Sequence, residues 1–141
     1  MDPIRAALIA SVLAWSGCYT TLVVHTRTHA NHDRRFYVVV RQVPEDQFAS
    51  EPYQKIANLV FSAAPDDNVT RAVQQVAPGH VTKLTVRVRE ALKPLDKQQP
   101  VAVYALVTEP GEAWKVLLTP PLQTRYDLDV DGDRLTVRAS R

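Results

Sequence analysis

Apolar residues recur at every second position through most of the chain after residue 20, and this spacing is typical of strands buried on one face. The alternation is clearest where Leu84, Val86 and Val88 are separated by threonine and arginine. Two other segments are apolar almost throughout, which favours central strands buried on both faces. The pattern predicts strands at Thr21–Arg27, Phe36–Val43, Val81–Arg89, Val101–Thr108 and Trp114–Leu118.

The last part of the chain has the pattern of a β-hairpin. Tyr126, Leu128 and Val130 alternate with aspartates on the way in, and Leu135 and Val137 alternate with polar residues on the way out. Asp131-Gly132 stands between them, and Asp-Gly is among the strongest short signals for a tight hairpin turn.

One segment, between Pro44 and Pro65, breaks the strand pattern. Its apolar residues Tyr53, Ile56, Ala57 and Val60 fall at helical spacing, which predicts one short helix. Val69–Val76 fits a helix or a strand, and we interpret it as a strand. The chain is therefore expected to be mostly β, with seven or eight strands in a two-sheet antiparallel β-sandwich that carries a short helical insertion.

Length and composition indicate one ordinary domain. The chain has 141 residues, of which 45% are hydrophobic and 23% charged. Seventeen basic residues against fifteen acidic ones leave a net charge of +2, and the arginines are spread over several segments, so nucleic acid is not an expected partner. Only four glycines occur, which argues against phosphate-binding loops.

The amino-terminal segment has the pattern of a lipoprotein signal peptide. Ala6–Trp15 is an apolar run too short to cross a bilayer, and small residues and Cys18, the only cysteine, follow it. Leu13-Ala14-Trp15-Ser16-Gly17-Cys18 resembles a bacterial lipobox. We therefore expect residues 1–17 to be removed, Cys18 to carry a covalent lipid, and residues 18–141 to form the single domain. The alternative is a short amino-terminal helix followed by a buried free cysteine.

Candidate catalytic and metal sites are weak in this sequence. His25, His29 and His32 have a spacing that could share a zinc ion, but no cysteine or carboxylate except Asp33 completes the set. The aspartates from Asp127 onward begin like a calcium loop, yet Arg138 stands where that loop needs a glutamate. No nucleophile motif or nucleotide-binding motif occurs. We therefore predict no catalytic residues, no metal site, no cofactor beyond the lipid, and no small-molecule substrate.

In the order of its parts, the chain resembles the TssJ (VasD-type) lipoproteins of type VI secretion systems. The similarity lies in the lipobox, in a valine-rich strand that ends in an arginine, Tyr37–Val43, in the helix that follows Phe48, in the apolar strand Val101–Leu106, and in Trp114-Lys115-Val116. Val43-Pro44, where the family tends to continue with a leucine, and Trp15 in the lipobox depart from the family pattern.

The resemblance implies a transthyretin-like sandwich with a structural, non-enzymatic role. Tyr19, rather than aspartate, after the cysteine implies the periplasmic face of the outer membrane. In the family, the loop between the first two strands binds the periplasmic domain of the inner-membrane subunit TssM. The matching partner-binding residues here are Thr28, His29, Ala30, Asn31, His32, Asp33, Arg34 and Arg35, with Arg34 and Arg35 as the expected anchors. The alternatives are a pilotin-like assembly lipoprotein and a lipoprotein that binds a ligand or metal through its histidines.

Overall fold

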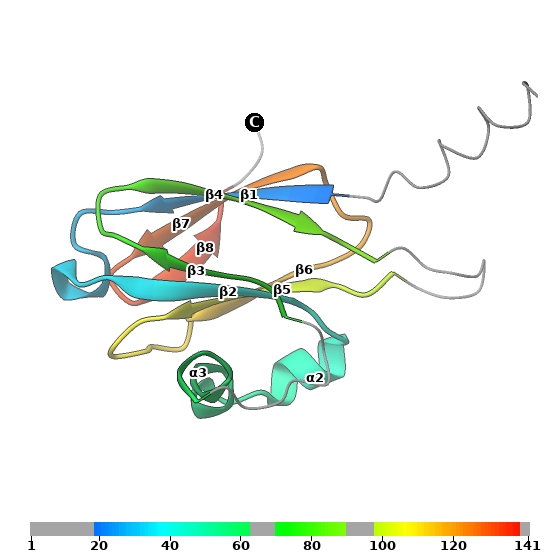
Figure 1. The fold of residues 1–141 in the computed structure, drawn as a ribbon, viewed down its shortest axis with the longest axis horizontal. Coiled ribbons are helices and arrows are strands. Elements are labelled where there is room, and N and C mark those ends of the chain that lie inside the picture. The colour runs from blue at the N-terminus through cyan, green and yellow to red at the C-terminus, as the bar shows by residue number, and fades with distance from the viewer. Residues whose placement is uncertain (1–18, 63–69, 90–97, 139–141) are drawn as a thin grey trace, which may run out of the picture.

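Two four-stranded sheets face each other in the computed structural model, which describes residues 19–62, 70–89 and 98–138 (Figure 1). Sheet A has the order β4-β1-β7-β8, and sheet B has the order β3-β2-β5-β6. In sheet A the strands are β1 (Tyr19–Thr26), β4 (Val81–Arg87), β7 (Arg125–Asp131) and β8 (Arg134–Val137). In sheet B they are β2 (Phe36–Gln42), β3 (Thr70–Val76), β5 (Val101–Leu106) and β6 (Lys115–Leu118). The predicted β-sandwich is confirmed, including a strand at Thr70–Val76.

The sandwich differs from the prediction in one pairing. β1 and β7 run parallel, with Leu22 opposite Tyr126 and Val24 opposite Leu128, whereas the other strand pairs are antiparallel. Parallel neighbours need a long connection, and nearly the whole chain separates these two strands. Alternation within each strand carries no information on such a distant pairing, so the predicted antiparallel sandwich is confirmed in its class and has one parallel strand pair that the sequence did not indicate.

The main core lies between the two sheets and is built from the alternating residues. Side chains with no exposure reach it from both sheets, and they include Leu22, Val24, Val38, Val40, Val103, Leu128 and Val130. β2 and β5 are buried along both faces, as their continuous apolar runs predicted. β4 is buried only at alternate positions, with Leu84 and Val86 inside.

The helical insertion covers the outer face of sheet B, where a second apolar cluster forms (Figure 1). It consists of two helices, α2 (Glu45–Ser50) and α3 (Tyr53–Phe61), instead of the single helix expected. Pro52 explains the break, because a residue before proline avoids the helical region, and Glu51 there has φ −78° and ψ 113°. Among the described residues, no helix is long and apolar enough to cross a membrane.

Trp114 belongs to this second cluster rather than to the core between the sheets. It precedes β6 by one residue and packs against the rings of Tyr53 and Tyr104, at 5.2 and 5.7 Å between ring centroids. Val116 and Leu118 contact the core between the sheets. The prediction that these three residues share a strand was therefore wrong for Trp114, because strand geometry begins only at Lys115.

Arg41, a charge at the end of a run of valines, is fully buried between sheet B and the helices. Its Nη1 donates to Glu51 Oε2 at 2.5 Å, and the Tyr104 hydroxyl donates to Glu51 Oε1 at 2.7 Å. Burial alone raises the pKa of Glu51, but the hydrogen bonds from Arg41 and Tyr104 and the Arg41 charge outweigh it, so the pKa lies below its ordinary value. This buried pair ties the end of α2 to the sheet.

Candidate partner-binding site

The loop between β1 and β2 contains a short 3-10 turn, η2 (Ala30–Asp33), at one end of the sandwich. Of the eight predicted partner-binding residues, Ala30 and Asn31 are buried, with 0% and 3% exposure. The other predicted residues are exposed: Thr28, His29, His32, Asp33, Arg34 and Arg35. The loop therefore has an internal part that holds its shape and an outer part that a partner can contact.

Asn31 joins three loops through its hydrogen bonds. Its amide nitrogen donates to the carbonyls of Arg34 and Arg35, both at 3.2 Å, within its own loop. Its amide oxygen accepts from the backbone N–H of Thr108 at 2.7 Å, beyond β5. Its backbone N–H donates to the carbonyl of Gly132 at 2.9 Å, in the turn between β7 and β8. A buried side chain with this many partners fixes the loop to its neighbours.

The backbone of the same loop is left-handed at three successive residues. Asn31, His32 and Asp33 have φ values of 50°, 51° and 62°. Asparagine and aspartate tolerate this region better than other side chains, whereas histidine is less suited to it, so the contacts of Asn31 compensate for a locally unfavourable backbone. The loop is thus held in one conformation before any partner arrives, which lowers the entropic cost of binding.

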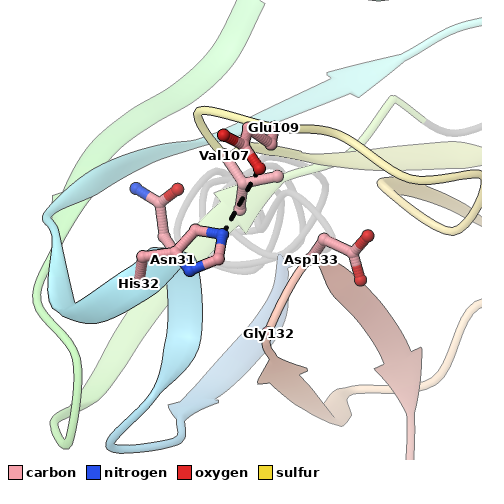
Figure 2. Close-up of a pocket in the computed structure, with 6 residues that line it drawn as sticks. All are labelled: Asn31, His32, Val107, Glu109, Gly132 and Asp133. Atoms are coloured by element: carbon pink, nitrogen blue, oxygen red, sulfur yellow. Dashed lines mark ion pairs between the residues drawn. The ribbon is translucent and has the colours of Figure 1, made fainter.

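A pocket of about 320 Å³ opens where the three loops meet (Figure 2). It is lined by Asn31, His32, Val107, Glu109, Gly132 and Asp133. His32 Nε2 lies 3.5 Å from Glu109 Oε2, and Figure 2 shows the imidazole ring turned toward that carboxylate. Both side chains are about three quarters exposed, so the pair is screened and available to a partner. Glu109 and Asp133 thus place two carboxylates at the end of the sandwich where the β1–β2 loop carries Arg34 and Arg35.

The turn that contributes Asp133 is shifted by one residue from the expected Asp131-Gly132. Asp131 pairs with Arg134, so Gly132 and Asp133 form the turn, and Gly132 has a φ of 61°. Glycine adopts this left-handed region without the strain that a side chain would cause, which suits it to the first central position of a tight hairpin turn. The shift places the Asp133 carboxylate at the pocket instead of within a strand.

The structure does not gather the three histidines at a metal site. His25 Nε2 lies 3.0 Å from Asp127 Oδ1 on sheet A, while His29 is within 3.5 Å of Asp33 in the loop. The residues that the structure describes contain no group of three or more side chains that could hold a metal ion. Hydrogen bonds from Arg125 and His25 lower the pKa of Asp127 to about 2. The oxygens of this carboxylate are therefore already occupied by protein side chains.

Sequence reasoning missed the residues that the other two loops bring to this site. Glu109 and Asp133 lie more than seventy positions after the β1–β2 loop along the chain, and nothing in their local pattern marks them. Pro110-Gly111 indicates a turn beside Glu109, but only the strand order brings that turn to the end of β1.

The chain is a member of the IglE N-terminal domain family, whose model matches residues 37–130. Serratia marcescens Lip, a membrane-bound component of the type VI secretion system, has the same fold, with 16% identity and a TM-score of 0.65 over 89% of this chain and 99% of Lip. The type VI lipoprotein TssJ1 of Pseudomonas aeruginosa matches at 16% identity and a TM-score of 0.61, over 89% of this chain and 99% of TssJ1.

A third match is a chain in the structure of the TssM C-terminal domain (869–1107) from EAEC. It has 21% identity and a TM-score of 0.63, over 86% of this chain and 98% of that chain. No curated protein sequence matches this one significantly. The resemblance to TssJ-type lipoproteins drawn from the sequence is thus confirmed at the level of the fold. Residues 1–18 lie outside the described residues, so the signal peptide and the lipid on Cys18 stay predictions.

We expect Asn31→Ala to lower the free energy of unfolding by about 2–4 kcal/mol, because it removes three side-chain hydrogen bonds and leaves alanine at positive φ. Asn31→Gly removes the same hydrogen bonds but suits the backbone, so it should lose about 1 kcal/mol less. Urea denaturation of both variants measures the difference. An Asn31→Ala protein as stable as the unmodified chain would contradict the role of Asn31 in holding the loop.

Proposed function

We propose that this protein is a lipid-anchored structural component of a type VI secretion membrane complex. Its Cys18 carries the lipid on the periplasmic face of the outer membrane, and its β1–β2 loop binds the periplasmic domain of a TssM-like inner-membrane subunit. It acts as a scaffold and not as an enzyme. The fold shared with type VI lipoproteins supports the proposal, as does the match to a chain in a structure named for the TssM C-terminal domain.

The observation that carries this proposal is the position of β1 between the anchor and the loop. β1 begins at Tyr19, immediately after Cys18, and ends at Thr26, just before the loop. Eight residues of strand span roughly 23 Å, at about 3.3 Å for each step. A lipid on Cys18 therefore holds one end of the sandwich at the membrane and directs the loop toward the periplasm, where an inner-membrane subunit reaches it.

The chemistry of the loop suits contact with a protein. Arg34 and Arg35 are exposed, and arginine is enriched among residues that dominate binding energy because its planar group pairs with carboxylates. The carboxylates of Glu109 and Asp133 line the pocket together with His32 of the same loop. This mixture of both charges on a fixed loop favours a partner with a complementary polar surface over a small apolar ligand.

The proposal is tested by a pull-down of residues 18–141, carrying Cys18→Ser, with the periplasmic domain of the TssM-like subunit from the same genome. Among the described residues, the buried hydrophobic side chains run from Leu22 to Leu135, so residues 18–141 retain them. We expect binding, and loss of binding when the exposed positions Thr28, His29, His32, Asp33, Arg34 and Arg35 are all replaced by serine while Ala30 and Asn31 are kept.

Ala30 and Asn31 are retained so that the loop keeps its conformation. A loss of binding can then be attributed to the six replaced side chains. Unchanged thermal stability of the variant is the control. Failure of the unmodified chain to bind at micromolar concentrations would contradict the proposal and favour a pilotin-like lipoprotein. A rise in melting temperature on adding zinc would favour the histidine-site alternative.

A further inference from the structure

The outer face of sheet A collects basic side chains that the sequence spreads over four strands. Alternation puts the odd-numbered residues of β1, β4 and β7 on this face, because their even-numbered neighbours fill the core. Basic residues outnumber carboxylates there. Within the strands they are Lys83, Arg87, Arg125 and Arg134, and Arg27, Arg89 and Arg138 follow one or two residues beyond strand ends, against Asp127, Asp129 and Asp131. This excess stands out in a chain whose total net charge is +2.

Ion pairs neutralise the middle of this face but not its end. Asp127 accepts hydrogen bonds from Arg125 and lies beside His25, and Asp129 accepts two from Arg138. Arg87 and Arg89 are exposed at the end of β4, and the described residues place no carboxylate within ion-pair distance of either guanidinium group. Within the described part of the chain, their charges are therefore available to a partner.

This uncompensated charge lies where the chain emerges from Cys18. Arg87 is directly opposite Tyr19 in the pairing of β4 with β1, so both side chains stand on the same face. Arg125 pairs with Thr21, two residues further along β1. Tyr19 is 54% exposed. Figure 1 shows that β1 starts at the end of the sheet where β4 stops. Tyr19, Arg87 and Arg89 together form the anchor-end patch, and Arg125 lies beside it but is paired with Asp127.

We propose that the anchor-end patch binds the anionic headgroups of phospholipids, so that the protein has a second contact with the membrane besides its lipid. The inference rests on the proposed acylation of Cys18, because only then does Tyr19 lie directly at the bilayer surface. Acyl chains combined with basic side chains give stronger anchoring than either alone, and tyrosine favours the membrane–water interface. Glu45 and Asp46 begin α2, one of the two helices that cover sheet B, and anionic headgroups repel their carboxylates. The patch would therefore bring sheet A, rather than sheet B, toward the membrane.

The consequence for the complex is orientation. A single lipid on Cys18 leaves the sandwich free to swivel about one attachment point, whereas the patch adds a second point on the same side. The β1–β2 loop lies at the opposite end of β1, so fixing one end restricts the directions in which the loop is presented. A loop whose orientation is already restricted loses less entropy when it binds a partner.

The test is sedimentation of residues 18–141, carrying Cys18→Ser, with vesicles of phosphatidylcholine alone or mixed with phosphatidylglycerol. Without the lipid, any binding comes from the protein surface. We expect binding only to the anionic vesicles and a decrease with added salt. Each arginine removed near a charged membrane weakens binding about fivefold, so Arg87→Ser/Arg89→Ser should weaken it about 25-fold.

Arg34→Ser/Arg35→Ser is the matched control, because it removes the same charge from two adjacent exposed arginines at the opposite end. It should keep vesicle binding and lose TssM binding, while Arg87→Ser/Arg89→Ser should do the reverse. The two variants therefore distinguish a failure of the membrane contact from a failure of the proposed TssM binding. No binding to anionic vesicles at low salt, or equal weakening by both variants, would overturn the membrane contact.

Discussion

Glu51→Ala is expected to lower the free energy of unfolding by about 3–5 kcal/mol, a large share of the stability of a domain this size. The substitution leaves the Arg41 guanidinium buried at 0% exposure without the carboxylate at 2.5 Å. It also removes the acceptor of the Tyr104 hydroxyl. Urea denaturation monitored by the fluorescence of Trp114, which packs on Tyr104, measures the loss.

The double variant Arg41→Met/Glu51→Met is the control for this interpretation. It removes both charges, so no buried arginine loses its carboxylate partner, and it should be more stable than Glu51→Ala. Equal destabilisation by the two proteins would mean that the loss comes from packing volume and not from breaking the ion pair.

The same carboxylate makes stability depend on pH. In the folded chain the pKa of Glu51 lies below its ordinary value of 4.5, so the ionised group stabilises the fold above that pH. The contribution is lost as the pH falls through the lowered folded-state pKa. The difference in stability between the unmodified protein and Glu51→Gln should therefore be constant near neutral pH and shrink below about pH 4.5. A difference that grows in acid would contradict the assignment.

The second large effect is expected at Ile56, the fully buried residue of α3. Ile56→Ala removes methyl groups from the cluster that holds the helices on sheet B, and such truncations cost about 2–5 kcal/mol. Gln54→Ala is the matched control on the same helix, because Gln54 is exposed and bonds only to Asn58, and it should change stability by less than about 0.5 kcal/mol.

Chemical denaturation of both variants decides whether α3 is part of the folding unit. An Ile56→Ala protein that unfolds like the unmodified one would mean that the helices contribute little to the sandwich.

Local patterning was enough to predict the strands and the buried faces. The alternation at Leu84, Val86 and Val88 reflects a strand with one buried side, and that relation holds whatever the strand pairs with. The parallel pairing of β1 with β7 could not be predicted in the same way, because it depends on how the whole chain closes.

The ion pair between Arg41 and Glu51 shows the same limit. A buried arginine is stable only with a carboxylate partner or contact with water. The sequence indicates that Arg41 needs such a partner but does not identify which residue supplies it. Glu51 lies ten positions away, in the break that Pro52 makes between two helices. The anchor-end patch was also hidden, because Tyr19 and Arg87 are far apart in the sequence and only the pairing of β1 with β4 places them together.

The assignment of the candidate site to the β1–β2 loop follows from the family resemblance and stays a prediction. Within that loop Asn31 was grouped with the partner-binding residues, but it is the buried residue that fixes the loop. A single asparagine in a polar run carries no signal for that role. Glu109 and Asp133 enter the site through tertiary structure alone.

The most direct test of the proposed function is a calorimetric titration of residues 18–141, with Cys18→Ser, against the periplasmic domain of the TssM-like subunit. Arginines that anchor an interface contribute at least about 2 kcal/mol, so Arg34→Ser/Arg35→Ser should raise the Kd at least about 30-fold. Arg87→Ser/Arg89→Ser should leave the Kd unchanged. A Kd unaffected by the loop arginines would contradict the assignment of the β1–β2 loop as the partner-binding site.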